Sequence, residues 1–165
     1  MEQKSVSDPS CAANLRRLRE DAGLTVQEVA AAIGLNNEWV WDLESYDEEL
    51  YMTISLATLQ RLAFLLRTTA RQLLLVEDKT SGETSVAFKD LVAHLREHLR
   101  ASGQSADAFG DEVGWDLAST LDDPNNVWEW SPDELRDVAA GLRIDWVGAL
   151  PTASDTPPKV GTFVP

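Results

Sequence analysis

The chain has 165 residues, 44% of them hydrophobic, which is enough for one ordinary domain or two small ones. Its 14 basic and 28 acidic residues give a formal charge of −14, which disfavours nucleic acid and anionic membranes as partners and favours basic protein surfaces. A single cysteine excludes an internal disulfide, and no apolar run is long enough for a signal peptide or a membrane span. We therefore expect a cytoplasmic protein without membrane association.

After an N-terminal tail at 1–11, the apolar spacing predicts helices. Leu15 and Leu18 recur at helical spacing, and Gly23 ends that first helix. Thr25 and Glu28 have the spacing of a capping box, so a second helix begins there and ends at Gly34. Two helices joined by a short turn are therefore expected between residues 12 and 34.

Three more helices complete the first half. Asn36 is a cap for a third helix that carries Val40 and Leu43 inward, and residues 46–51 are expected to form a loop. Ser55 caps a fourth helix with a buried stripe, and residues 69–76 supply a short fifth. The stripe consists of Leu59, Leu62, Ala63 and Leu66. Residues 12–76 are thus predicted to form an all-helical domain.

The second half repeats the first after a polar linker at 77–86. A shift of 80 places aligns one set of core positions and glycines, and a shift of 76 aligns a second set. The first set pairs Leu15 with Leu95, Gly23 with Gly103, Val29 with Phe109, Ile33 with Val113 and Gly34 with Gly114. The second pairs Ser55 with Ser131, Leu59 with Leu135, Ala63 with Ala139, Leu66 with Leu142 and Leu74 with Leu150. We expect a second domain at 87–150, with its third helix in the least defined register, and a flexible tail at 151–165.

The first half resembles a known family over about sixty residues. The residues that carry the resemblance are Leu18-Arg-Glu-Asp-Ala-Gly-Leu-Thr25, Glu28-Val-Ala30, Ile33-Gly-Leu35, Leu43-Glu44 and Ser55-Leu-Ala-Thr-Leu59. They are similar to the Cro/C1-type (XRE) helix-turn-helix family, and the second half resembles a degenerate member. The resemblance implies an all-α fold of two tandem five-helix domains. It also implies DNA binding and roles as repressors or antitoxins. Members of the family frequently dimerise, so a homodimer is possible.

The charges on the third helix depart from that family. Its outward positions would be Asn37, Glu38, Trp41, Asp42 and Ser45, and residues 37–49 contain six acids and no base. Each carboxylate within about 4 Å of a phosphate costs about 1 kcal/mol even at the dielectric of water. Several such costs outweigh one amide–adenine pair worth about 1–3 kcal/mol, which Asn37 could supply. The second half is also acidic, with four bases and twelve acids from 91 to 150.

These charges favour a non-enzymatic protein that binds a protein partner, which is basic or itself handles nucleic acid. An antitoxin, an immunity factor, an anti-repressor or a subunit of a larger complex would fit this description. An exposed Trp among carboxylates is typical of a protein-binding hot spot. The candidate partner-binding residues are Asn37, Glu38, Trp41, Asp42, Ser45, Asp47, Glu48 and Glu49. A second interpretation is open, in which Trp41 packs on the other domain or on the 46–51 loop. Trp39 is expected to be partly covered.

The alternative function is a DNA-binding transcriptional regulator of the same family. It requires Arg16, Arg17 and Arg19 along the DNA backbone while Asn37 reads bases. In the alternative interpretation, these arginines are solvated side chains on amphipathic helices and contact no DNA. His94-Leu-Arg-Glu-His98 matches a short zinc-peptidase pattern, but no second ligand motif follows it, so no metal, cofactor or catalytic residue is predicted.

Overall fold

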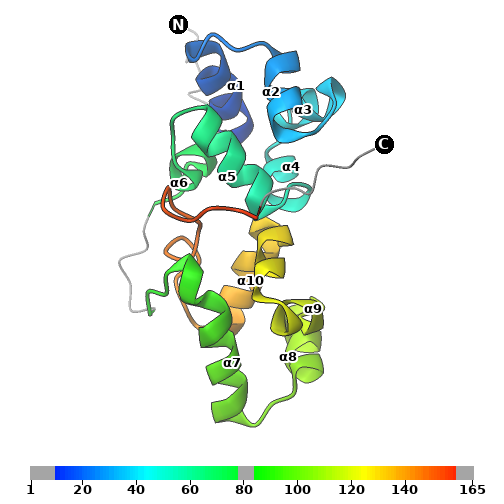
Figure 1. Ribbon diagram of the computed structural model, residues 1–165, viewed down its shortest axis with the longest axis vertical. Helices are drawn as coiled ribbons and strands as arrows, with labels where there is room; N and C mark the ends of the chain where they lie inside the picture. The colour runs from blue at the N-terminus through cyan, green and yellow to red at the C-terminus, as the bar shows by residue number, and fades with distance from the viewer. Residues whose placement is uncertain (1–9, 78–83, 159–165) are drawn as a thin grey trace, which may run out of the picture.

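The computed structural model describes residues 10–77 and 84–158, and within them the chain is helical and forms two lobes stacked along its long axis (Figure 1). The predicted all-α class is confirmed for these residues. The described parts contain no β-strand, only an isolated bridge between Thr84 and Ile144. The predicted terminal segments 1–9 and 159–165 and the centre of the predicted linker, 78–83, lie outside the described residues.

The first lobe contains six helices: α1 (Cys11–Asp21), α2 (Val26–Ile33), α3 (Asn37–Leu43), α4 (Asp47–Met52), α5 (Leu56–Leu65) and α6 (Ala70–Leu74). The predicted caps at Thr25, Asn36 and Ser55 are confirmed, since each side chain accepts from the backbone amide three residues later. The predicted inward residues Val40 and Leu43 are fully buried. Local capping chemistry therefore defines most of this lobe.

One element of the first lobe differs from the sequence expectation. Residues 46–51 were expected to form a loop, whereas α4 occupies Asp47–Met52. Three acids in its first turn favour a helix N-terminus, and Leu50 is fully buried in the core. The first lobe therefore has one helix more than the five predicted.

The second lobe contains η1 (Phe88–Asp90), α7 (Leu91–Ser102), α8 (Ala106–Val113), α9 (Ala118–Asp122), η2 (Pro124–Glu129) and α10 (Pro132–Leu142). Gly103 and Gly114 have positive φ values of 69° and 85° and end α7 and α8, as Gly23 and Gly34 do at the corresponding turns. Ser131 caps α10 as predicted. The aligned glycines and cap thus have the same conformations in both lobes.

The predicted fifth helix of the second lobe is wrong. Arg143 adopts φ 56° and ends α10, and residues 143–150 form a bridge and turns. The buried Asp145 carboxylate accepts from the amides of Val147 and Gly148 at 3.1 Å each, which holds a turn that competes with a helix. The second lobe therefore has four α-helices, and not the five-helix arrangement predicted.

The two lobes share one continuous core and are joined by direct bonds. The amide of Leu56 donates to the carbonyl of Trp130 at 2.7 Å, and the Arg136 guanidinium lies 5.9 Å from the centre of the Tyr51 ring. The chain after α10 returns to the first lobe and passes beside α5 (Figure 1). The lobes are therefore fixed relative to each other by both packing and hydrogen bonds.

The predicted flexible tail at 151–165 is wrong for residues 151–158, which we term the strap. Pro151 is buried, and the Gln60 side chain on α5 donates to the carbonyl of Thr152 at 2.6 Å and to that of Asp155 at 3.3 Å. Asp155 in turn accepts from the Thr152 amide at 2.8 Å. The strap thus has a defined conformation on the first lobe. Within the described residues, no helix is long and apolar enough to cross a bilayer.

Candidate recognition surface

Helices α2 and α3 meet at a short turn whose geometry is set by local bonds. Thr25 and Glu28 form the predicted capping box at the start of α2. Gly34 adopts φ 73° at its end, and the amide of Leu35 donates to the carbonyl of Ala30 at 3.0 Å. Asn36 then caps α3 through the amide of Trp39 at 3.0 Å. The turn therefore holds α3 at a fixed angle and leaves one of its faces outward.

The outward face of α3 combines a tryptophan with carboxylates, and we define the α3 face as Glu38, Trp41 and Asp42. The prediction that Trp41 faces out is confirmed by an exposed fraction of 58%, so it is not buried against the second lobe or α4. Trp39 is 41% exposed, in line with the partial cover expected. Glu38 and Asp42 are exposed and lie one helical turn apart, on the same side as Trp41. This face offers apolar area with a negative rim.

The other candidate residues on α3 and after it have more local roles. Asn37, in the first turn of α3, is partly covered, and the Ser45 hydroxyl donates to the Trp41 carbonyl at 2.6 Å. Glu49 is half-buried and Glu48 is exposed. Ser45 therefore closes the end of α3, and Glu48 extends the acidic surface beyond it.

Asp47 holds two helices together. Its Oδ1 accepts from the Ser10 hydroxyl at 2.5 Å, from the Ala12 amide at 2.8 Å and from the Cys11 thiol at 3.4 Å. Burial acts to raise the pKa of Asp47, but these hydrogen bonds outweigh it and the pKa is lowered. The carboxylate thus caps the N-terminus of α1 from the start of α4, and that oxygen is occupied within the fold.

Arg19, one of the arginines expected to follow DNA, is bound internally. Its Nε donates to Glu44 Oε1 at 2.5 Å and its Nη2 to Oε2 at 3.0 Å, and Nη1 donates to the Leu24 carbonyl at 2.9 Å. The Arg19 and Glu44 side chains are only 12% and 6% exposed. The hydrogen bond to Glu44 raises the pKa of Arg19 above its ordinary value. All three donor nitrogens of Arg19 have partners within the fold, which disfavours the DNA-backbone contact expected for it.

Arg16 and Arg17 lie on different sides of α1. Arg16 pairs with Glu20 at 3.1 Å and lines a hollow of about 210 Å³ beside Trp41. Arg17 pairs with Asp21 at 2.9 Å and lies toward α6. Both guanidiniums are well exposed, and such surface pairs contribute little stability. The structure brings Arg16 to the α3 face and separates Arg17 from it, a relationship the sequence pattern had not indicated.

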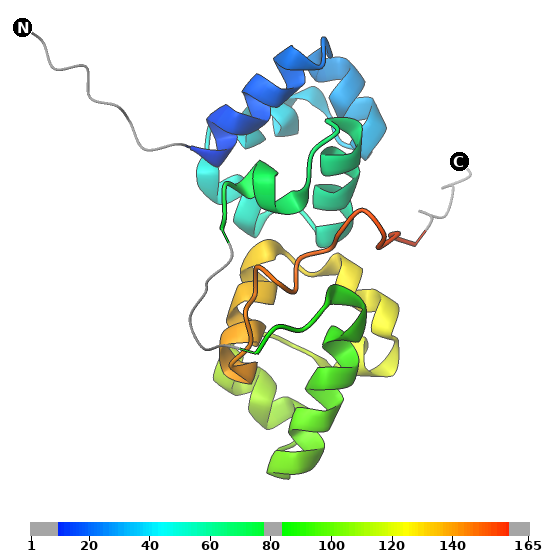
Figure 2. The same ribbon diagram turned by 90° about the vertical axis from the view of Figure 1, so that its left-hand side faces the viewer.

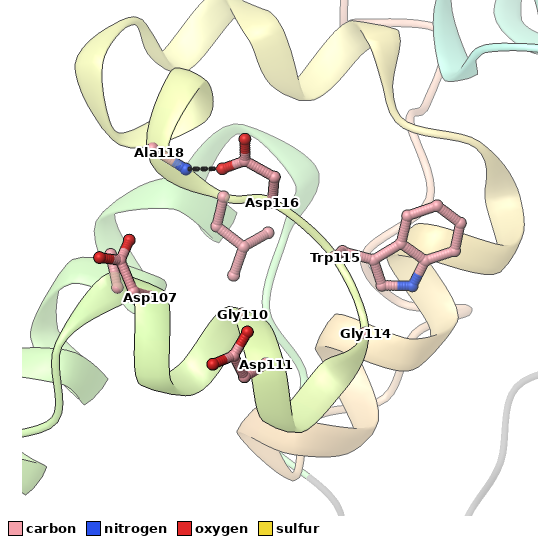
Figure 3. A pocket seen from close by; sticks show the side chains of 9 residues that line it. Asp107, Gly110, Asp111, Gly114, Trp115, Asp116 and Ala118 are labelled. Atoms are coloured by element: carbon pink, nitrogen blue, oxygen red, sulfur yellow. Dashed lines mark hydrogen bonds between the residues drawn. The ribbon is translucent and has the colours of Figure 1, made fainter.

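The corresponding turn of the second lobe borders a hollow of about 570 Å³ with three carboxylates, Asp107, Asp111 and Asp116 (Figure 3). Asp116 accepts from the Ala118 amide at 3.0 Å, and Trp115 points away, donating to Asp137 at 3.0 Å. A side chain at Gly110 would meet the Trp115 carbonyl at 2.6 Å, so only glycine fits there. This second turn is therefore acidic as well.

The metal-like sequence pattern is not assembled into a site. His98 packs on Phe109, with ring centres 5.2 Å apart, and His94 lies one turn earlier on α7. Among the described residues, no group of three or more His, Cys, Asp or Glu side chains has an arrangement that could hold a metal ion. His98 is thus a packing residue of the second lobe.

Comparison with known proteins agrees with this geometry. Residues 12–74, which span α1 to α6, match a family model described as a helix-turn-helix domain. The first lobe is therefore similar to helix-turn-helix domains, with α2 and α3 as the two helices on either side of the turn. A comparison with curated proteins found no match.

Proposed function

We propose that this chain is a non-enzymatic regulatory protein of the cytoplasm that binds a basic protein surface through the α3 face. The observation that carries the proposal is the combination of Trp41, 58% exposed, with the exposed carboxylates of Glu38 and Asp42 on the helix that follows the turn. An exposed tryptophan with a polar rim suits a protein-binding hot spot. The carboxylates favour cationic side chains opposite them.

The internal bonds of the first lobe support the same ligand class. Arg19, which lines the hollow beside Trp41, is bound to Glu44 and is therefore unavailable to a phosphate. Arg16 lies beside Trp41 but shares its charge with Glu20. Phosphate binding requires cations that displace counterions, and the α3 face places carboxylates there instead. A basic protein is therefore a better match to this face than a nucleic acid backbone.

The second candidate is a DNA-binding regulator of the Cro/C1 (XRE) type. The match of residues 12–74 to a helix-turn-helix model favours it at least as strongly as the charges favour a protein partner. In this mode Asn37 reads a base and Arg16 contacts the backbone, while Glu38 and Asp42 are left facing the duplex. Its salt dependence would be shallow, because few cations are available.

We also propose that the second lobe arose as a copy of the first. Gly103 and Gly114 repeat the conformations of Gly23 and Gly34. The amide of Trp115 donates to the carbonyl of Gly110 at 3.0 Å, as the amide of Leu35 does to that of Ala30. These shared turns support the duplication, and the missing final helix marks the second copy as the more divergent one.

One pair of substitutions separates the two functions. Glu38→Gln with Asp42→Asn removes two charges from the α3 face and keeps side-chain size. If the ligand is a basic protein, affinity falls. If it is DNA, affinity for duplex DNA measured by fluorescence anisotropy between about 50 and 200 mM salt rises, because repulsion from phosphates is removed.

A pull-down from native lysate supplies the partner for that test. We expect the wild type and Phe64→Ala, an exposed aromatic on α5, to retain the same protein with and without nuclease, and Trp41→Ala to lose it. Two results together would reject the protein-binding proposal in favour of the DNA-binding regulator. The captured protein would be lost after nuclease treatment, and the Glu38→Gln, Asp42→Asn variant would bind duplex DNA more tightly than the wild type. Capture that Trp41→Ala leaves unchanged would show that the α3 face is not the contact.

A further inference from the structure

Three arginines from three segments line one hollow on the first lobe, although the chain is strongly acidic. The hollow has a volume of about 630 Å³ and is lined by residues of α1 and α6, two helices of the first lobe that contact each other (Figure 2). We term it the arginine hollow, and the residues used below are Asn14, Arg17, Arg67, Arg71, Leu75 and Glu77. Among the described residues that line it, Glu77 is the single acid. The local charge of the lining is therefore opposite to that of the whole chain.

Arg17 is held at this hollow by a buried amide. Its Nη2 donates to Asn14 Oδ1 at 2.8 Å, and Asn14 is only 8% exposed. The Asn14 amide nitrogen donates in turn to the carbonyls of Gln72 and Leu73, at 2.8 and 3.1 Å, at the end of α6. Asp21 shares the Arg17 charge at 2.9 Å but leaves the guanidinium exposed. The orientation of Arg17 is thus set before any ligand binds.

Arg67 and Leu75 occupy backbone conformations that disfavour a side chain. Their φ values are 54° and 56°, a region that costs a residue other than glycine about 1 kcal/mol or more. Within the described residues, the Arg67 guanidinium makes no hydrogen bond or ion pair, and Leu75 is 40% exposed. Both residues line the arginine hollow, one before α6 and one after it. A cation and an apolar side chain therefore occupy positions where glycine would be unstrained, as Arg143 does at the end of α10.

We propose that the arginine hollow binds a small organic anion, an effector that carries a phosphate or carboxylate group next to an apolar portion. Guanidinium forks match both oxyanions with two parallel hydrogen bonds. Ligand pockets have volumes of about 300–1,000 Å³, and this hollow lies within that range. Arg67 holds the oxyanion, and Leu75 contacts the apolar portion. Arg71 and Arg17, whose exposed guanidinium is already paired with Asp21, line the same wall and add positive charge.

Binding at this place would join elements that are far apart in the sequence. Arg17 belongs to α1, whereas Arg67 lies in the turn between α5 and α6. A ligand that contacts both stabilises the folded first lobe, with a Tm rise of about 5 °C when its concentration is far above Kd. The proposal is independent of the ligand of the α3 face, since none of its residues belongs to that face.

Thermal unfolding of the full chain tests the proposal, with inorganic phosphate and citrate as separate probes at matched ionic strength. Arg67→Gly removes the guanidinium and relieves the positive φ, so the variant folds. Arg16→Gln is the control for loss of an arginine, because Arg16 lies on α1 with Arg17 but outside the hollow. We expect a saturable Tm rise in the wild type and in Arg16→Gln, with at least tenfold weaker binding in Arg67→Gly. Saturation by one probe alone identifies the oxyanion group.

Three results would overturn the proposal. Phosphate stabilises many proteins by exclusion from their surfaces, so a linear response of equal size in all variants would show that no site exists. A saturable response that Arg67→Gly retains in full would place the anion elsewhere. Protection by duplex DNA, with no response to either small anion, would assign the arginines to nucleic acid.

Discussion

Arg19 and Glu44 form a two-pronged ion pair that joins α1 to the residue after α3, with N–O distances of 2.5 and 3.0 Å. The pair is largely buried and lies immediately behind the α3 face. It removes a base and an acid from the set of residues available to a ligand. The position of α3 therefore depends on this pair as well as on the turn.

Arg19→Ala should destabilise the protein by about 3 kcal/mol, because Glu44 is left as a buried, uncompensated charge. This corresponds to a Tm lower by about 6–12 °C in thermal unfolding followed by circular dichroism. The double variant Arg19→Met with Glu44→Met is the control and should recover much of the loss, since it buries no charge. Equal losses in the single and double variants would mean that packing, and not the charge, is what Arg19 supplies.

Cys11 should resist thiol reagents in the folded protein. Burial, followed by the hydrogen bond to Asp47 and its charge, raises the pKa of Cys11 to about 12, and the side chain is 4% exposed. Since the thiolate is the reactive form, we expect very slow labelling by a disulfide reagent at pH 8 and rapid labelling in denaturant. Fast labelling of the native chain would show that the contact between α1 and α4 opens readily.

Glu134 should make the protein less stable as pH rises from about 4.5 to 7. Burial, opposed by a hydrogen bond from Ser131 and aided by the charge of Asp116, raises the pKa of Glu134 to about 7. The unfolded chain loses this proton at lower pH than the folded one, so ionisation favours unfolding across that window. Glu134→Gln should stabilise the protein by on the order of 1–2 kcal/mol at pH 8 and have little effect at pH 4. This free energy is smaller than the pKa shift alone would give, because the carboxylate keeps some contact with solvent. Urea unfolding at both pH values measures this, with Glu129→Gln, the same substitution at an exposed position, as the comparison variant.

Gln60→Ala should release the strap from α5. The Gln60 side chain is 7% exposed and donates to the carbonyls of Thr152 and Asp155, so its loss leaves both without this donor. We expect a loss of about 1–2 kcal/mol and faster proteolytic cleavage between 151 and 158, mapped by mass spectrometry. Phe64→Ala alters the same region without removing a bond to the strap and should leave cleavage unchanged. Unchanged cleavage in Gln60→Ala would mean that packing alone retains the strap.

The sequence by itself determined the local features of both lobes. Thr25 with Glu28, Asn36, Ser55 and Ser131 cap helices where predicted, because capping bonds join residues only three positions apart. Gly34 ends α2 because glycine adopts the left-handed conformation without strain. The outward position of Trp41 followed from helical periodicity around the buried Val40. These features require no knowledge of distant contacts.

Only the tertiary structure decided which charged residues are available. Arg19 and Glu44 are 25 positions apart, and Asp47 reaches the amide of Ala12 across 35. Gln60 reaches the strap across 92 positions, which is why residues 151–158 read as a tail in the sequence. Such pairs depend on how the helices pack. The positions of charged residues along the sequence do not indicate which of them meet in the folded chain. The fold thereby placed Arg16 beside the α3 face, and Arg17 beside Arg67 at a separate hollow.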